Sequence, residues 1–121
     1  MKNAINWFEL PARNFERAVK FYNALLNAQL RVVDLMGTPN AIFPSDDEGA
    51  GGSIVKRDGD QPSTSGVLVY LNVAGDLDGA LTRAEPAGGK MLVPKTHLGE
   101  FGYMAIIIDT EGNRVGLHSP N

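Results

Sequence analysis

Residues 5–26 read INWFELPARNFERAVKFYNALL, an extended segment that runs directly into a helical one. Residues 5–12 alternate imperfectly between apolar and other side chains, as expected of a strand with one buried face. From residue 15 the apolar side chains recur at steps of three and four, which is typical of an amphipathic helix, and Asn14 can serve as its N-cap. The segment therefore predicts a β-strand followed at once by an α-helix.

Three further strands are predicted in the first half of the chain. Residues 30–35 and 41–43 flank a turn at residues 37–40, and residues 53–56 follow an acidic, glycine-rich loop at residues 45–52. Turn residues between apolar runs indicate where each strand ends. The order of elements in this half is thus β-α-β-β-β.

The second half of the chain repeats this order. It begins with a predicted strand at residues 67–73 and a helix that is capped by Asp76 and ends at Gly88-Gly89. Three more strands are predicted at residues 90–94, 103–108 and 114–118, with a loop at 96–102 and a turn at 109–113 between them. The repeat indicates two βαβββ modules, residues 4–57 and 67–119, joined by a polar linker at residues 58–66. Because about 60 residues bury only a modest core, the modules must pack together or against a second chain.

Length and composition narrow the class of protein. The chain has 121 residues, no cysteine, two histidines and a formal charge of −3. Without cysteine there is no disulfide, thiolate zinc site, iron–sulfur cluster or cysteine nucleophile, which fits an intracellular protein. Interspersed charges disfavour a nucleic-acid partner, and no apolar run approaches the roughly 18 residues of a spanning helix. We expect a cytoplasmic protein of one domain that binds neither nucleic acid nor membranes.

Strand alternation predicts which side chains line a binding site. Two sheets set side by side would curve around a central cleft lined by the strand faces turned away from the helices. The predicted lining residues are Trp7, Glu9, Leu68, Tyr70, Asn72, Gly116 and His118. Aromatic walls with a few polar groups are typical of a small-molecule pocket. The loop residues Lys95, Thr96, His97 and Glu100 offer further polar contacts where a lid or rim would sit.

Three motifs carry a family resemblance: NWFELP at residues 6–11, FERAVKFY at residues 15–22 and DTEGNRVGLH at residues 109–118. Together they resemble the vicinal oxygen chelate superfamily, which contains glyoxalase I, extradiol dioxygenases, and bleomycin and fosfomycin resistance proteins. The resemblance spans essentially the whole chain. It implies an α+β fold of two tandem βαβββ modules that form an incomplete barrel around a central cleft. It also implies a homodimer, with modules paired across chains or within one chain.

The resemblance also identifies where a metal would be held. Glyoxalase-type members bind one divalent metal through His or Gln and Glu side chains on the first and last strands of each module. These positions fall on Trp7, Leu68 and Gly116 and near Ser53 or Ile54. None of these residue types is a normal ligand for such an ion, so we expect no metal and no cofactor.

An alternative metal set stays open, because strand alternation does not determine whether side chains converge. It combines Glu9 and His118 with His97 or Glu100.

Glu9 and His118 are the candidate catalytic residues. Glu9 is a carboxylate beside Trp7 on the inward face, where it could act as a base, bind a substrate cation, or bridge to Arg13 or Lys95. His118 suits acid/base chemistry because its ordinary pKa is near neutrality. The alternative for His118 is a histidine packed near the chain terminus and hydrogen-bonded to backbone.

The sequence leaves two main functions open. The first is a metal-free binding or sequestering protein of the bleomycin-resistance type, with a small organic molecule in an aromatic and acidic cleft. The second is a glyoxalase-like lyase or isomerase that uses Glu9 or His118 on a carbonyl substrate. A third, a subunit whose fold serves only dimer assembly, has less in its favour. We favour binding, because the residues at the metal positions have become Trp, Leu and Gly.

Overall fold

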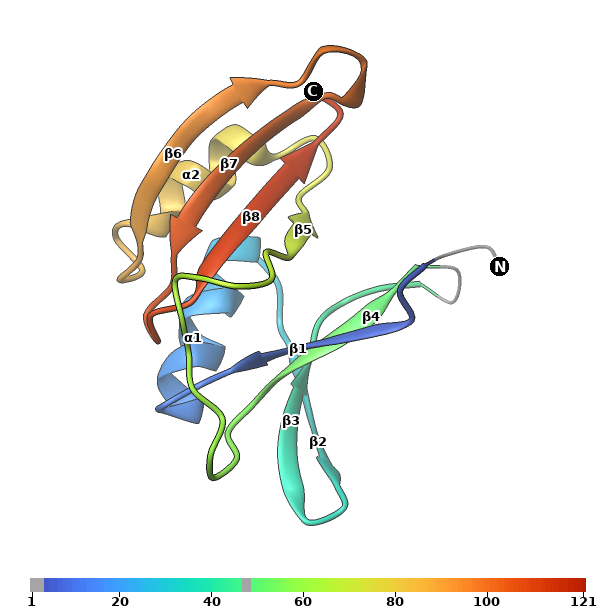
Figure 1. Cartoon of the computed structure of the whole chain (residues 1–121), viewed down its shortest axis with the longest axis vertical. Helices are drawn as coiled ribbons and strands as arrows, with labels where there is room; N and C mark the ends of the chain where they lie inside the picture. Colours follow the sequence, from blue (N-terminus) through green and yellow to red (C-terminus); the bar gives the residue numbers. More distant parts are fainter. Residues whose placement is uncertain (1–3, 47–48) are drawn as a thin grey trace.

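The repeated order of elements appears twice in the computed structural model, which describes residues 4–46 and 49–121 (Figure 1). The first module contains β1 (Trp7–Pro11), α1 (Phe15–Leu26), β2 (Arg31–Leu35), β3 (Thr38–Ile42) and β4 (Gly51–Val55). The second contains β5 (Tyr70–Asn72), α2 (Leu77–Ala84), β6 (Lys90–His97), the short 3-10 helix η1 (Gly99–Phe101), β7 (Tyr103–Ile108) and β8 (Arg114–Ser119). The predicted α+β fold of two modules is confirmed.

Each module forms its own four-stranded mixed sheet. The strand orders are β1-β4-β3-β2 and β5-β8-β7-β6, so the first strand of each module lies at a sheet edge. In both sheets this first strand pairs in parallel with the last strand of its module, and the remaining pairs are antiparallel. The two sheets do not join into a closed barrel in the described part of the chain.

Helix α1 begins and ends as its sequence predicts. Asn14 has an extended backbone, and its side chain accepts a hydrogen bond from the N–H of Arg17 at 3.1 Å. The helix ends at Asn27, whose φ of 49° is the left-handed conformation that asparagine tolerates. Asp76 stands at the predicted N-cap of α2, but its carboxylate pairs with Arg83 at 2.7 Å and makes no capping bond.

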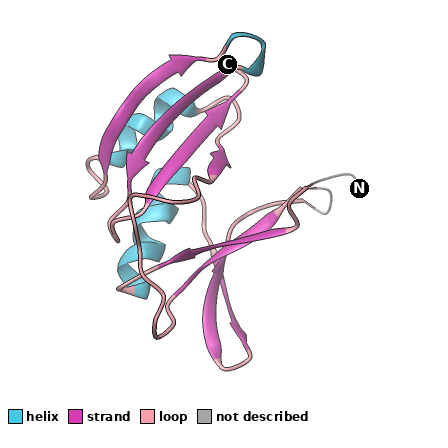
Figure 2. Cartoon of the chain, in the orientation of Figure 1, coloured by secondary structure: helices cyan, strands magenta, loops and turns pink. Residues whose placement is uncertain are grey.

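One apolar core joins the two modules. It contains Leu10, Ala41 and Ile54 from the first sheet, Leu71, Ala105, Ile107, Val115 and Leu117 from the second, and Ala18, Phe21, Tyr22, Leu25, Leu77, Ala80 and Ala84 from the helices. The helices contact each other, α1 contacts β4, and α2 contacts β6, β7 and β8. Figure 2 shows the two helices together, and in the view of Figure 1 α2 lies behind the second sheet. Each sheet therefore has one face in the common core and one face without a helix.

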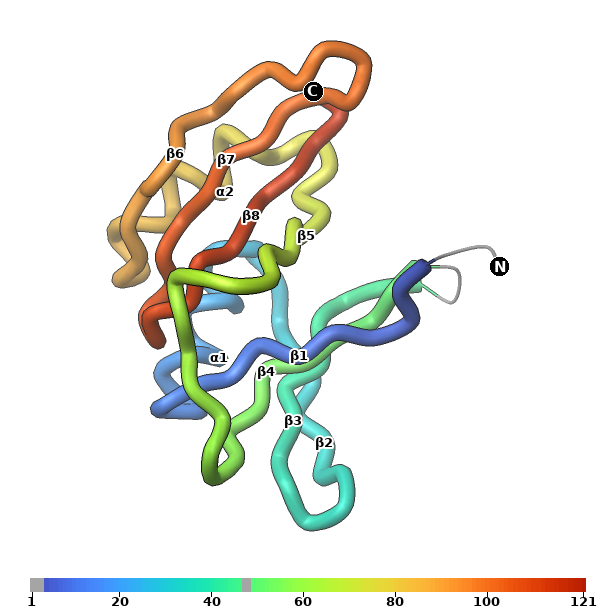
Figure 3. The backbone as a smooth tube through the Cα atoms, viewed as in Figure 1, coloured from blue at the N-terminus to red at the C-terminus, as the bar shows by residue number. Residues whose placement is uncertain are grey.

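In the view of Figure 3 the linker rises from the end of β4 in front of α1 and then crosses to β5. Within it, Ser63 accepts a hydrogen bond from the N–H of Arg114 at 3.1 Å, which ties the linker to the start of β8. Pro62 is buried. The polar linker predicted at residues 58–66 is thus attached to the second module along part of its length.

Several element boundaries differ from the prediction. Strand β4 begins at Gly51, two residues inside the predicted loop, and α2 ends at Ala84, before Gly88-Gly89. The turn between β2 and β3 lies at Met36 and Gly37, whose φ values of 54° and 82° suit a two-residue hairpin, so residues 38–40 belong to β3. Strand β6 extends to His97 because register shifts let it follow β7 beyond residue 94. Strand β5 is only three residues long, and Val67, expected under the helix, is 91% exposed. Val67 lies before the segment that pairs with β8, so strand alternation does not apply to it.

Candidate functional site

Four of the predicted cleft residues lie together on the helix-free side of the second sheet. Tyr70 is opposite Gly116, and Asn72 is opposite His118, in the parallel pairing of β5 and β8. Strand β7 continues the same face with Met104, Ile106 and Ile108, which are opposite His118, Gly116 and Arg114. We call this surface, Tyr70, Asn72, Met104, Ile106, Ile108, Arg114, Gly116 and His118, the open face of the second sheet.

An aromatic ring covers a glycine on this face. The ring of Tyr70 lies so close to Gly116 that a Cβ added there would be 2.3 Å from it. The first module contains the same arrangement, because Trp7 is opposite Gly51 and a Cβ at Gly51 would be 2.9 Å from the indole. Trp7 and Tyr70 are 46% and 45% exposed. Each module thus presents a half-exposed aromatic ring supported by a glycine.

Gly51 was missed by sequence reasoning, because its role depends on which residue of β4 pairs with Trp7. The core pairs Leu10–Ile54 and Leu71–Leu117 show which positions of the two modules correspond. By this register Ser53 is equivalent to Gly116 and Leu68 to Trp7, which are the positions that the sequence indicated.

Within one chain, Trp7 and Glu9 lie on a different surface from Tyr70, Asn72, Gly116 and His118. They lie with Gly51 and Ser53 on the helix-free side of the first sheet, which we call the open face of the first sheet. The opposite sides of both sheets share the common core with the helices between them. The two open faces lie outside that core and do not form the two walls of one cleft, although the sequence suggested a cleft between them.

An open groove lies between the modules instead, with a volume of about 910 Å³. The start of the chain, the end of α1 and the segment after β3 form one side, with Ile5, Phe8 and Phe43 among the lining residues. Residues 67–74, including β5, form the other side. Among the predicted binding residues, Leu68, Tyr70 and Asn72 line this groove, and Trp7, Glu9, Gly116, His118 and the loop residues 95–97 and 100 do not.

Glu9 is held by a cation from the linker. Its carboxylate forms an ion pair with the guanidinium of Arg57, which also pairs with Asp60 at 3.2 Å. The hydrogen bond to Glu9, followed by that to Asp60, raises the pKa of Arg57. The partner is thus Arg57 rather than Arg13 or Lys95, and the charge of Glu9 is compensated within the chain.

His118 is half-buried and already has a hydrogen-bond partner. Its Nε2 lies 2.5 Å from the backbone carbonyl oxygen of Phe101. Since a carbonyl oxygen can only accept, Nε2 carries the hydrogen. This contact corresponds to the backbone-bonded histidine that the sequence left as the alternative to an acid/base role.

The four polar residues of the predicted lid or rim lie in or beside the hairpin of β6 and β7. Lys95 pairs with Asp78 at 3.2 Å, and its Nζ lies 4.7 Å above the centre of the Tyr103 ring. On the same ring, His97 packs with a centroid distance of 4.8 Å. Thr96 donates to the carbonyl of Pro94 at 2.8 Å, and Glu100 is exposed on η1. Their role in ligand binding stays a prediction.

The residues present do not fit the divalent cation that the resemblance implies. At the positions that the resemblance gives stand Trp7, Leu68, Ser53 and Gly116, and the ring of Tyr70 occupies the space into which a side chain at Gly116 would extend. The hydroxyl of Ser53 donates to the side chain of Asn40 at 2.8 Å. Within residues 4–46 and 49–121 no three His, Asp or Glu side chains come together as a candidate metal site. The alternative set of Glu9, His118, His97 and Glu100 is therefore not assembled in the described part of one chain.

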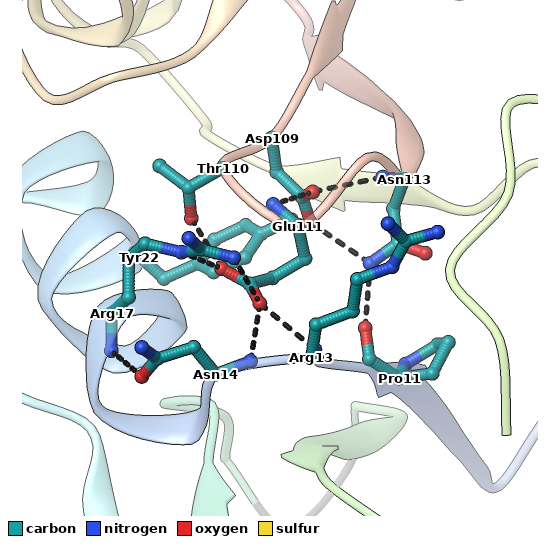
Figure 4. A network of polar contacts seen from close by, with 9 residues as sticks. All are labelled: Pro11, Arg13, Asn14, Arg17, Tyr22, Asp109, Thr110, Glu111 and Asn113. Carbon is teal, nitrogen blue, oxygen red and sulfur yellow. Dashed lines mark hydrogen bonds and ion pairs between the residues drawn. The ribbon is translucent and has the colours of Figure 1, made fainter.

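The turn between β7 and β8 holds the two modules together (Figure 4). The carboxylate of Glu111 accepts hydrogen bonds from the backbone N–H groups of Arg13 and Asn14 at 2.8 and 2.7 Å. It also pairs with Nε of Arg17 at 2.8 Å. Burial favours a raised pKa for Glu111, but the hydrogen bonds from Arg17, Asn14 and Thr110 lower that pKa overall. An acidic residue of the second module thus binds the start of α1 in the first, where the helix dipole favours an anion.

Buried Asp109 accepts hydrogen bonds from within the same turn and from α1. It accepts a hydrogen bond from the hydroxyl of Tyr22 at 2.6 Å and from the N–H groups of Glu111 and Asn113 at 2.8 and 2.9 Å. Asn113 in turn donates to the carbonyl of Pro11 at 2.8 Å. Burial, and next the charge of Asp109, raise the pKa of Tyr22 well above its ordinary value. The closing motif therefore fixes the arrangement of the modules.

A family model described as the Glyoxalase/Bleomycin resistance protein/Dioxygenase superfamily matches residues 4–117, nearly the whole of both modules. The chain belongs to this superfamily. Solved structures of the superfamily have the same fold. A glyoxalase/bleomycin resistance protein from Albidiferax ferrireducens T118 is 17% identical, covers 97% of this chain and 98% of its own, and gives a TM-score of 0.75.

Two further structures are similar over nearly the whole chain. A glyoxalase/bleomycin resistance protein/dioxygenase family enzyme from Burkholderia phytofirmans PsJN is 12% identical, with a TM-score of 0.70 over 96% of this chain and 98% of its own. A genomically encoded fosfomycin resistance protein from Listeria monocytogenes is 13% identical, with a TM-score of 0.70 over 98% of this chain and 91% of its own. Identities this low establish the fold alone. No curated protein matches the chain.

Across residues 4–46 and 49–121, the helices are too short or too polar to traverse a lipid bilayer.

Proposed function

We propose that this superfamily member is a metal-free binding protein that holds a small planar organic molecule against Trp7 and Tyr70. The observation that supports this function is the aromatic ring over a glycine, which occurs on the helix-free side of the sheet in both modules. A glycine beneath a ring lets the ring lie flat on the sheet, where its outer surface is available for stacking. By the resemblance to the glyoxalase type, Trp7 stands at a metal-ligand position, and the ring of Tyr70 covers Gly116, which stands at another.

We further propose that a second copy of the chain supplies the opposite wall of the cleft. One chain keeps its two open faces apart, so a ligand stacked on Tyr70 has no second wall from the same chain. The outer edge of β5 has no strand partner in the described part of the chain, and it lies along the open groove. Strand β1, which carries Trp7, is also an edge strand. Unpaired edges can pair with another chain, and a symmetric homodimer would form two equal clefts.

The ligand would meet a cleft that is aromatic but not strongly acidic. Glu9, the acidic residue predicted for this surface, is neutralised by Arg57. Its ion pair instead offers a polar group near Trp7 that can orient a ligand.

Replacing either aromatic ring should weaken binding of N-phenylnaphthylamine, a neutral aromatic probe whose fluorescence rises in apolar sites. Trp7→Leu and Tyr70→Leu each remove one stacking surface, so we expect the dissociation constant to rise roughly tenfold in each variant. Fluorescence titration measures this constant. Phe101→Leu, which removes an exposed ring elsewhere on the second module, is the matched control and should bind as the wild type does. Unchanged affinity in Tyr70→Leu would contradict the proposed site.

Mixing the two variants tests whether one cleft is shared between two chains. If Trp7 of one chain and Tyr70 of its partner line the same cleft, each mixed dimer has one intact cleft and one that lacks both rings. Refolding the variants together at equal concentration should then restore wild-type affinity in about a quarter of the clefts, because half of randomly paired dimers are mixed. Clefts made within one chain would show no restoration.

A glyoxalase-like lyase or isomerase is the second function, and the contacts of its two candidate residues favour it less. Glu9 is ion-paired with Arg57, and the Nε2 of His118 is bonded to Phe101. Proton transfer beside a carbonyl group would carry deuterium from heavy water into hydroxyacetone, which mass spectrometry detects. We expect wild type and Glu9→Gln to give the same background incorporation. Incorporation by the wild type that Glu9→Gln abolishes, with probe binding retained, would establish the enzyme instead.

A further inference from the structure

We propose that the ligand of this protein carries a carboxylate, and that Arg114 binds it on the open face of the second sheet. The inference rests on the proposed function, because it names the chemical class of the molecule that stacks on Tyr70. Arg114 was not among the residues that the sequence suggested for the site.

Strand register places Arg114 beside the aromatic ring. Arg114 is opposite Ile108 of β7, and Gly116, two residues further along β8, is opposite Tyr70 and Ile106. Residues two apart on a strand point to the same face and are separated by about 6.6 Å. The basic side chain and the ring of Tyr70 thus arise from adjacent positions on one surface, with isoleucine side chains beside both.

The hydrogen bonds of Arg114 are incomplete. Its Nη2 donates to the carbonyl oxygen of Gly66 at 3.0 Å. Its Nε is buried, and it is the one buried side-chain nitrogen or oxygen without a partner in the described residues. No Asp or Glu forms an ion pair with it there, whereas Arg17, Arg57 and Arg83 each have one. A buried donor without an acceptor costs free energy that a bound acceptor would recover.

The charge of the surrounding surface favours an anion. The open face contains no Asp or Glu, although the chain as a whole has a formal charge of −3. Lys90 of β6 is opposite Ile108, in the same row across the sheet as Arg114, and adds a second positive charge. The planar guanidinium can donate two parallel hydrogen bonds to the oxygens of one carboxylate.

The spacing limits the size of the ligand. An aromatic ring stacked at Tyr70 with a carboxylate at Arg114 spans about two residues of strand, roughly 7 Å. A single aromatic ring that bears a carboxylate has these dimensions. The apolar side of such a molecule would lie over Ile106.

Isothermal titration calorimetry with anthranilate and anthranilamide tests the carboxylate directly, because the two probes share a ring and differ in charge. We expect the wild type to bind anthranilate about tenfold more tightly than anthranilamide, since a charged pair with two hydrogen bonds replaces a neutral contact. Arg114→Gln should remove this preference while leaving anthranilamide binding unchanged, and Arg114→Lys should retain part of it. Lys20→Gln on α1 removes one positive charge away from the open face of the second sheet, so it should leave the affinity for both probes unchanged.

The outcomes separate this inference from the proposed function. Equal binding of both probes, with both weakened by Tyr70→Leu, would refute the carboxylate site and leave aromatic binding in place. Failure of the wild type to bind either probe would refute both. Lys90→Gln is a second variant for the case that Arg114→Gln lowers the stability of the fold. Lys90 is exposed, so its replacement should leave the fold intact. In Lys90→Gln we expect the affinity for anthranilate to fall about threefold and the affinity for anthranilamide to stay the same. If neither Lys90→Gln nor Arg114→Gln lowered the affinity for anthranilate, the inference would be overturned.

Discussion

Asp109→Ala is expected to lower the free energy of unfolding by about 4 kcal/mol, a large share of what a small domain has. Asp109 is 5% exposed and accepts hydrogen bonds from the hydroxyl of Tyr22 and from the N–H groups of Glu111 and Asn113. It also accepts one from the side-chain amide of Asn113 at 3.0 Å. Alanine would leave these buried donors without an acceptor. Urea denaturation followed by circular dichroism measures the loss.

The matched control for this experiment is Asp58→Ala, which removes an exposed carboxylate from the turn in the linker. It should change the free energy of unfolding by no more than about 0.5 kcal/mol. If Asp109→Ala were as stable as the control, the turn after β7 would not be the structure that fixes the modules. Because the contacts of Asp109 connect α1 with the β7–β8 turn, the loss should also make the unfolding transition less cooperative.

Glu111→Gln is expected to cost about 2 kcal/mol at neutral pH and to reduce the loss of stability in acid. Hydrogen bonds lower the pKa of Glu111 in the folded chain from its ordinary value of 4.5, despite burial, so the folded state favours the charged form. The resulting stabilisation is present above the unfolded pKa and is lost as the pH falls through the lowered folded value. The wild type should therefore lose stability below about pH 4.5 more steeply than the variant does.

Urea denaturation at a series of pH values between neutrality and acid measures this difference. Glu85→Gln is the control, because Glu85 is exposed at the end of α2. In Glu85→Gln the free energy of unfolding should depend on pH as steeply as it does in the wild type. Parallel curves for the wild type and Glu111→Gln would show that the ion pair with Arg17 and the bonds to the start of α1 do not contribute to acid stability.

Local sequence predicted the elements whose ends are set by neighbouring residues. Helix α1 begins after Asn14 because that side chain bonds to the N–H of Arg17 three residues later. Strand β5 was predicted too long, because the pairing that ends it lies on β8, more than forty residues away in sequence. The turn at Met36 and Gly37 was displaced because register with β3 determines which residues form the hairpin loop.

The candidate site was predictable where only strand alternation mattered. Tyr70, Asn72, Gly116 and His118 share one face as expected, since alternate residues of a strand point the same way. The partner of Glu9 was not predictable, because Arg57 lies in the linker, where no periodicity applies. Gly51 and Arg114 gained significance only from register, which depends on how distant strands align.

The sequence by itself determined the duplication, the order of elements in each module and the face on which each strand residue lies, because these follow from periods of two and 3.6 residues along the chain. Tertiary structure decided where those faces point. The common core and the contacts of Asp109 and Glu111 hold the helices between the sheets, so the two open faces are separated within one chain. This arrangement depends on contacts between residues nearly one hundred positions apart, and no local pattern specifies such contacts.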